Sequence, residues 1–209
     1  MLACGDGDRH KNKTTKTSTE LVLAAWQAKD DKTEIRDLIR KMLNWAESQK
    51  TLKLVPELTD SKDSLCIGFD LKKLETNLQV LKATEFFTPE FIYNYKQIIL
   101  TLDRKVKNNE FKWVTDELPP FNFANDVDPW CDSQDEPYDK PNPWDLVEVK
   151  VVSLNKQKGE FSWTWGQLKA DMSPDWKEFN YRFKVQKEQG KWKIAYLDGF
   201  DFKQGTTTM

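Results

Sequence analysis

The segment DVDPWCDSQDEP, residues 126–137, holds a dense set of side chains that could ligate a metal or react. Carboxylates are the ligands that calcium prefers, which makes Asp126, Asp128 and Asp132 weak candidates for a calcium site. An EF-hand loop is not present, because residues 129–131 are Pro, Trp and Cys, where that loop needs oxygen ligands and a glycine. The pattern favours a structural loop in which an aspartate caps backbone amides, and it predicts no metal.

Few residues elsewhere in the chain could carry catalysis. His10 is the single histidine, which excludes Ser–His and Cys–His nucleophilic machinery and leaves no paired zinc ligands among the widely spaced cysteines. No glycine-rich phosphate loop is present, so no cofactor is expected. Acid–base chemistry by Asp198 with Tyr196 or Tyr181 remains open, although a turn aspartate and two core tyrosine rings explain the same residues.

The N-terminal residues MLACG match the end of a bacterial lipobox, in which the cysteine becomes lipidated. Cys4 is therefore a candidate lipidation site. The polar segment after it lacks periodic apolar residues and cannot repay its ordering entropy by burial, so residues 1–20 are predicted to be a tether. These features predict a lipid-anchored protein in the cell envelope of a Gram-negative bacterium, on the outer membrane or the periplasmic face.

The remaining two cysteines, Cys66 and Cys131, are predicted to form a disulfide, because such a compartment is oxidising and an even number is left. Free buried thiols are the alternative. No apolar run approaches the roughly 18 residues that would span a bilayer, so only the lipid would attach the chain to a membrane.

Composition places the rest of the chain among globular proteins. Hydrophobic residues make up 38% and charged residues 32% of the 209 residues, which predicts one domain over residues 21–205 and a short tail at 206–209. The formal net charge is −2, and no segment has a face dominated by lysine and arginine. Nucleic acid is therefore not an expected partner.

The first half of the domain has the apolar period of helices. Residues 31–48 carry a stripe from Ile35 to Ala46, with Asp31 and Glu34 in a capping-box-like arrangement at the expected start. Residues 51–70 read as a long connection with one short strand, and leucines at 71, 74, 78 and 81 mark a second helix. Thr88 and Pro89 then predict the start of a third helix that runs to about Lys107.

After residue 143 the period changes to two, which is typical of half-buried antiparallel strands. The alternating sets are 147/149/151, 161/163/165, 179/181/183/185 and 192/194/196, with a turn at EQGK between the last two. Helices followed by hairpin strands predict an α+β fold with the N-terminal helices packed on one face of a curved antiparallel sheet.

Two motifs resemble one family. GKWKIAYLDGF, residues 190–200, is similar to the terminal hairpin strand of nuclear transport factor 2-like domains. DVDPWCDSQD resembles the Asp-x-Asp-Pro and Gln-Asp motif of a bacterial, often lipid-anchored group of unknown function within that superfamily. The resemblance implies a cone of helices wrapped against a bent sheet, but it implies no activity, because that scaffold hosts enzymes and binding modules alike.

Two functions remain open at this point. The first is a non-catalytic module that binds a small ligand or an envelope protein, with Trp130, Trp144, Trp163 and Trp165 as the expected contact residues at its rim. The second is a small lyase or isomerase that uses an acid–tyrosine pair from Asp198, Tyr196 and Tyr181. The inward-facing strand positions carry no central carboxylate, lysine or histidine, which favours the binding module.

Overall fold

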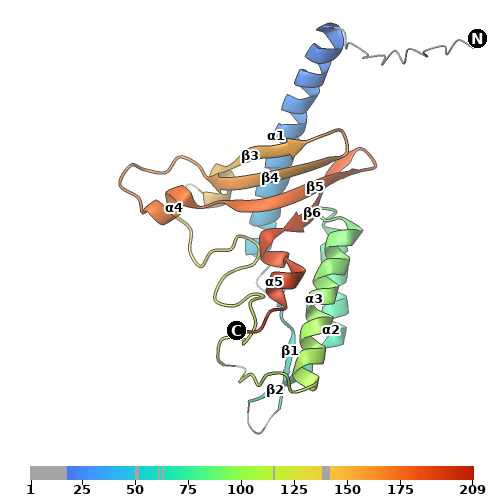
Figure 1. Ribbon diagram of the computed structural model, residues 1–209, viewed down its shortest axis with the longest axis vertical. Coiled ribbons are helices and arrows are strands. Elements are labelled where there is room, and N and C mark those ends of the chain that lie inside the picture. Colours follow the sequence, from blue (N-terminus) through green and yellow to red (C-terminus); the bar gives the residue numbers. More distant parts are fainter. Residues whose placement is uncertain (1–17, 50–51, 61, 63, 115, 138–141) are drawn as a thin grey trace, which may run out of the picture.

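The computed structural model describes residues 18–49, 52–60, 62, 64–114, 116–137 and 142–209 (Figure 1). They form a mixed α+β fold, as the sequence predicts. Its strands are β1 (Glu57–Thr59), β2 (Cys66–Phe69), β3 (Val147–Leu154), β4 (Lys158–Trp165), β5 (Tyr181–Glu188) and β6 (Lys191–Leu197). Its helices are α1 (Ser18–Ser48), α2 (Leu71–Ala83), α3 (Pro89–Lys107), α4 (Pro174–Glu178) and α5 (Phe202–Gly205), with short 3-10 turns η1 (Pro143–Leu146) and η2 (Asp198–Phe200).

Strands β3 to β6 form one antiparallel sheet in sequence order. Short turns join β3 to β4 and β5 to β6, whereas the β4–β5 connection carries α4. The alternation read from the sequence sets the inner face of the sheet. Phe161, Phe183 and Leu197 lie opposite one another on β4, β5 and β6, and none of the three side chains is exposed. Trp163 and Tyr181 form the next row. This inner face is filled with large rings and forms one wall of the core.

A β-bulge at Ala195 changes the parity of the last strand. Ile194 pairs with Val185 and Tyr196 pairs with Lys184, so Ala195 is an extra residue on β6. Leu197 is therefore buried in place of Tyr196, which points to the outer face, contrary to the strict alternation expected from the sequence. Gly190 has φ +83 at the preceding turn, which glycine adopts without strain.

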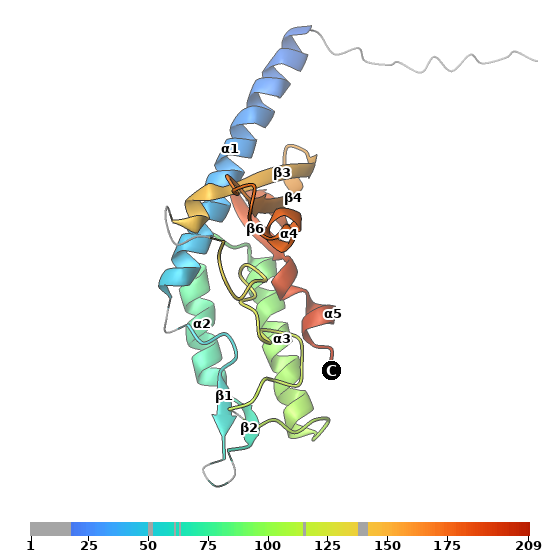
Figure 2. The same ribbon diagram turned by 90° about the vertical axis from the view of Figure 1, so that its left-hand side faces the viewer.

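Helix α1 begins at Ser18, well before the expected start at Asp31. It crosses the sheet, where it contacts β3 and β6, and its N-terminal part extends beyond the strands (Figure 2). The Arg40 guanidinium donates two hydrogen bonds, of 2.9 and 2.7 Å, to the Val147 carbonyl and so fixes the helix to β3. Asp31 does not cap the helix but binds the β5–β6 hairpin.

The connection before α2 folds into the β1–β2 hairpin, which packs against α3. Gly68 has φ +144, and a Cβ there would lie 2.9 Å from a carboxylate oxygen of Asp103. That carboxylate also accepts a 2.8 Å hydrogen bond from the Phe69 amide. At the start of α3, Thr88 Oγ1 accepts from the Phe91 amide and Pro89 occupies the first turn, which confirms the predicted helix start.

The predicted disulfide is wrong, because Cys66 and Cys131 are both free, buried thiols. Cys66 lies on β2, where its thiol faces the Gly68 carbonyl, whereas the Cys131 thiol faces the carbonyls of Asp128 and Ser133. Each thiol thus lies against carbonyls of its own segment of the chain. The predicted tail also packs on the domain, since Thr208 forms an antiparallel bridge with Phe121. The candidate lipidation site, Cys4, lies outside the described residues.

Candidate functional site

The acid-rich loop, residues 126–137, is held by hydrogen bonds from its own backbone amides to Asp128, which is the structural role that the sequence favours. Asp128 Oδ1 accepts a 2.9 Å hydrogen bond from the Trp130 amide, and the Asp128 carbonyl accepts from the amides of Cys131 and Asp132. In the described part of the chain no group of three or more Asp, Glu, His or Cys side chains could hold a metal ion. Asp126, Asp128 and Asp132 are thus not gathered into such a group.

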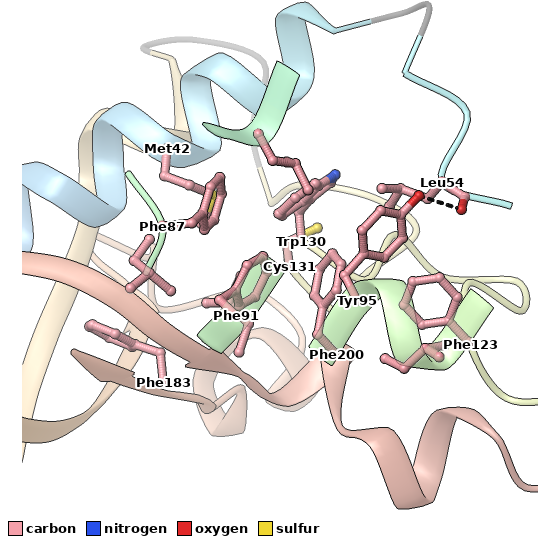
Figure 3. Close-up of a cluster of buried hydrophobic side chains, with 14 of the residues drawn as sticks. Met42, Leu54, Phe87, Phe91, Tyr95, Phe123, Trp130, Cys131, Phe183 and Phe200 are labelled. Carbon is pink, nitrogen blue, oxygen red and sulfur yellow. Dashed lines mark hydrogen bonds between the residues drawn. The ribbon is translucent and has the colours of Figure 1, made fainter. Parts of the chain in front are cut away.

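Trp130 carries this loop into the core. Its ring lies 4.6 Å from the Phe200 ring, 5.7 Å from Phe87 and 5.8 Å from Trp45, measured between centroids. Figure 3 shows the indole surrounded by side chains of α1, α3 and the C-terminal segment. Only 5% of Trp130 is exposed. The loop thus closes the core between the helices and the sheet.

The predicted tryptophan rim is not a surface in this structure. The rings of Trp144 and Trp165 lie 5.4 Å apart in a tilted arrangement and are as buried as Trp130, and Trp163 is fully buried. The reason is the strong packing of their rings against one another and against Phe179 and Tyr181. None of the four can be a rim contact for a ligand, which corrects the expectation from the sequence.

The acid–tyrosine pair does exist, but its carboxylate is already occupied. Tyr196 donates a 3.0 Å hydrogen bond to Asp198 Oδ1, while Asp198 Oδ2 accepts from the backbone N–H and the Nε of Arg182, each at 3.1 Å. Burial, followed by the negative charge of Asp198, raises the pKa of the Tyr196 phenol well above its usual value. The pair is a closed network at the end of β6.

Tyr181 is a structural tyrosine. Its hydroxyl donates to the Pro129 carbonyl at 2.8 Å and accepts from the Gly199 amide at 3.0 Å. A Cβ at Gly199 would lie only 2.1 Å from the same Pro129 carbonyl. Tyr181 and Gly199 therefore lock the acid-rich loop onto the end of β6, and burial raises the pKa of the phenol.

A groove outside the core offers the better site. It has a volume of about 750 Å³ and lies between the outer face of the sheet, α3 and α5. We name it the sheet–α3 groove. Among its lining residues are Glu90, Tyr93, Asn94 and Gln97 of α3, Lys158 and Glu160 of β4, Lys184 and Gln186 of β5, Tyr196 of β6 and Phe202 of α5.

Two regular features position these side chains. On α3 the residues recur at spacings of three and four, so they share the helix face opposite the buried stripe. On the sheet, Glu160 pairs with Lys184 and Lys184 pairs with Tyr196, which places one cross-strand row on the outer face. The Lys184 ammonium lies 5.4 Å from the centre of the Tyr196 ring.

The groove's polar side chains are largely uncommitted. Those of Glu90, Gln97, Lys158, Glu160 and Gln186 make no hydrogen bond or ion pair with any other residue that the structure describes. Asn94 is an exception, because its amide donates to the Phe200 carbonyl at 2.7 Å. The site was missed in the sequence because polar residues on an outer helix face and an outer strand face look like ordinary solvated surface.

Searches for related proteins identified no matching family model, no matching curated protein and no matching solved structure. The resemblance to nuclear transport factor 2-like domains thus has no support beyond the two sequence motifs. Among the described helices, none combines the length and apolar character needed to cross a bilayer.

Proposed function

We propose that this chain is a non-catalytic module that binds a small ligand in the sheet–α3 groove. One observation carries the proposal: a concave site of about 750 Å³ displays uncommitted polar groups beside exposed aromatic rings. Sites for small molecules have volumes of about 300–1,000 Å³ and combine apolar surface with a few polar groups. The filled inner face of the sheet supports binding from outside the core.

The alternative, a small lyase or isomerase, is less well supported. A general base needs a free lone pair within reach of a substrate proton, and the Asp198 carboxylate has three of its roughly four acceptor sites taken by hydrogen bonds from Arg182 and Tyr196. Tyr181 is enclosed in the core and bonded on both sides. The three residues therefore serve better as a brace for the end of β6 than as an acid–base pair.

Small-molecule binding should perturb one defined surface. We expect amide chemical-shift changes on titration with a library of sugars, amino acids, hydroxy acids and nucleosides to gather on 90–97, 158–160 and 184–186. The Tyr93→Ala variant should weaken the responding ligand by about tenfold, since a stacking ring at a contact centre contributes more than 1 kcal/mol. Perturbations confined to other surfaces, or none with any library member, would reject the proposal.

The matched control is Leu118→Ala. Leu118 is 61% exposed and Tyr93 is 64% exposed, so neither substitution opens a cavity, but Leu118 does not line the groove. Both variants should keep the parent's thermal stability, and only Tyr93→Ala should lose affinity.

The proposal includes attachment to the cell envelope of a Gram-negative bacterium through a lipid on Cys4. Mass spectrometry of peptides from the membrane-bound protein, alkylated before and after denaturation, tests this together with the free thiols. We expect a diacyl or triacyl adduct on Cys4, and alkylation of Cys66 and Cys131 only after denaturation. Burial raises the pKa of the Cys131 thiol to about 12, which suppresses the reactive thiolate at neutral pH.

Unmodified Cys4 in a cytosolic protein would contradict the anchor, and a Cys66–Cys131 crosslinked peptide would contradict the free thiols. We also propose that the sheet and its helices form a nuclear transport factor 2-like cone. In this chain such a cone would bind from its outer surface, because rings fill its inner one.

A further inference from the structure

We infer that the ligand of the sheet–α3 groove is an uncharged saccharide, an inference that rests on the proposed function. The groove combines three properties: balanced charge, exposed aromatic rings on two walls, and both hydrogen-bond donors and acceptors without partners. A sugar ring offers the complement of all three, because its hydroxyls donate and accept while its C–H face is apolar.

The charge of the groove argues against an ionic ligand. Glu90 and Glu160 supply two negative charges, and Lys158 and Lys184 supply two positive charges. A ligand with net charge would meet both signs at short range and gain little Coulomb energy. A neutral polar ligand has no such conflict, and the charged groups serve it as strong donors and acceptors.

The neighbouring groove makes the contrast clear. Tyr93 also lines this groove, which has a volume of about 520 Å³ and carries Lys82, Lys96 and Lys193. Lys96 pairs with Glu75 at 2.6 Å and Lys193 with Glu188 at 3.6 Å, which leaves Lys82 without an ion pair among the described residues. An anionic ligand would prefer that surface. The two grooves thus separate ligands by charge, and binding that maps to one or the other identifies the ligand class.

Aromatic rings are present where a sugar ring could stack. Tyr93 on α3 is 64% exposed and Phe202 on α5 is 41% exposed, and both line the groove. Neither ring makes an aromatic contact with another described ring, in contrast to the rings of the core. Tyr196 on β6 also lines the groove, and the Lys184 ammonium lies 5.4 Å from the centre of its ring.

Polar groups complete the match. The amides of Gln97 and Gln186 each carry two donors and one acceptor oxygen, and the carboxylate of Glu160 accepts only. No other described residue occupies them. These groups lie in one open groove. Such a groove suits an oligosaccharide of several sugar units.

The test titrates the full chain with cellotetraose, chitotetraose and maltotetraose by calorimetry and amide chemical shifts. At least one should bind, with shifts on the groove. Tyr93→Ala and Phe202→Ala should each lower the affinity by about tenfold. Leu118→Ala, which lies outside the groove, should leave the affinity unchanged. Raising NaCl from about 0.05 to 0.5 M should leave it unchanged, because screening acts on charged ligands.

Each outcome decides between the two proposals. If no saccharide binds but another member of the small-molecule library perturbs the groove, the saccharide inference is wrong and the binding function stands. If a saccharide binds elsewhere, or with affinity that falls steeply with salt, the inference is also wrong. If nothing perturbs the groove, both fail.

Discussion

Replacing Trp130 by alanine is expected to lower the free energy of unfolding by about 3–5 kcal/mol, the range for removing a large ring from a packed core. The indole is 5% exposed and touches the rings of Trp45, Phe87 and Phe200, which come from three separate segments. Filling the cavity left by the indole would require these segments to move together with the helices that carry them. Urea denaturation followed by far-UV circular dichroism measures the loss.

Trp176→Ala is the control for this experiment. Trp176 lies on the short helix α4, is half-buried, and has one aromatic neighbour, Trp165, at 6.0 Å. Its removal should cost about 1 kcal/mol, in proportion to the smaller apolar area that it covers. Equal losses for the two variants would show that Trp130 is not the centre of the core and would reopen a surface role for it.

The acid-rich loop shows why its role could be predicted from the sequence but its position could not. The spacing of Asp128 and Trp130 is enough to predict a local turn, since the carboxylate and the amide are two residues apart. Burial of the indole depends on Phe87 and Phe200, which are far away in the sequence. Nothing in the local pattern distinguishes a tryptophan that faces solvent from one that plugs the core.

The starts of α3 and α1 differ in the same way, because only the first depends on local contacts. Thr88 and Pro89 predict the start of α3 correctly, because capping uses atoms within one turn. Asp31 and Glu34 form an equally plausible local pattern at the wrong place. The Asp31 carboxylate instead accepts hydrogen bonds from Lys187 and Trp192. These partners are distant in the sequence, so no local pattern could predict them.

The groove was missed for a third reason. Both of its walls obey the predicted periods, since the α3 residues follow a helical spacing and Glu160, Lys184 and Tyr196 share one outer row. Two factors were absent from the local pattern: the bulge at Ala195, which turns Tyr196 outward, and the approach of α3 to that face. A site made from two polar surfaces emerges only when their relative placement is known.

Breaking the Asp31–Lys187 ion pair should give the second large loss of stability. The Lys187 ammonium lies 2.9 Å from Asp31 Oδ1, and the same oxygen accepts a 2.9 Å hydrogen bond from the Trp192 indole. The Asp31 side chain is only 11% exposed and the Lys187 side chain 18%. Lys187→Met should therefore lower the free energy of unfolding by about 3 kcal/mol, because it leaves a carboxylate largely removed from water without its counter-ion.

A double-mutant cycle tests whether the loss comes from the unpaired charge. Asp31→Leu with Lys187→Met should cost at least about 1.5 kcal/mol less than the sum of the single changes, since neither charge is then left alone. The exposed pair Glu85–Lys191, at 3.6 Å, provides the matched control and should show no measurable coupling. Additive losses at Asp31 and Lys187 would contradict the ion pair. A coupling that persists in about 1 M NaCl would distinguish it from a screened surface pair, and would show that α1 is held to the β5–β6 hairpin by charge as well as by packing.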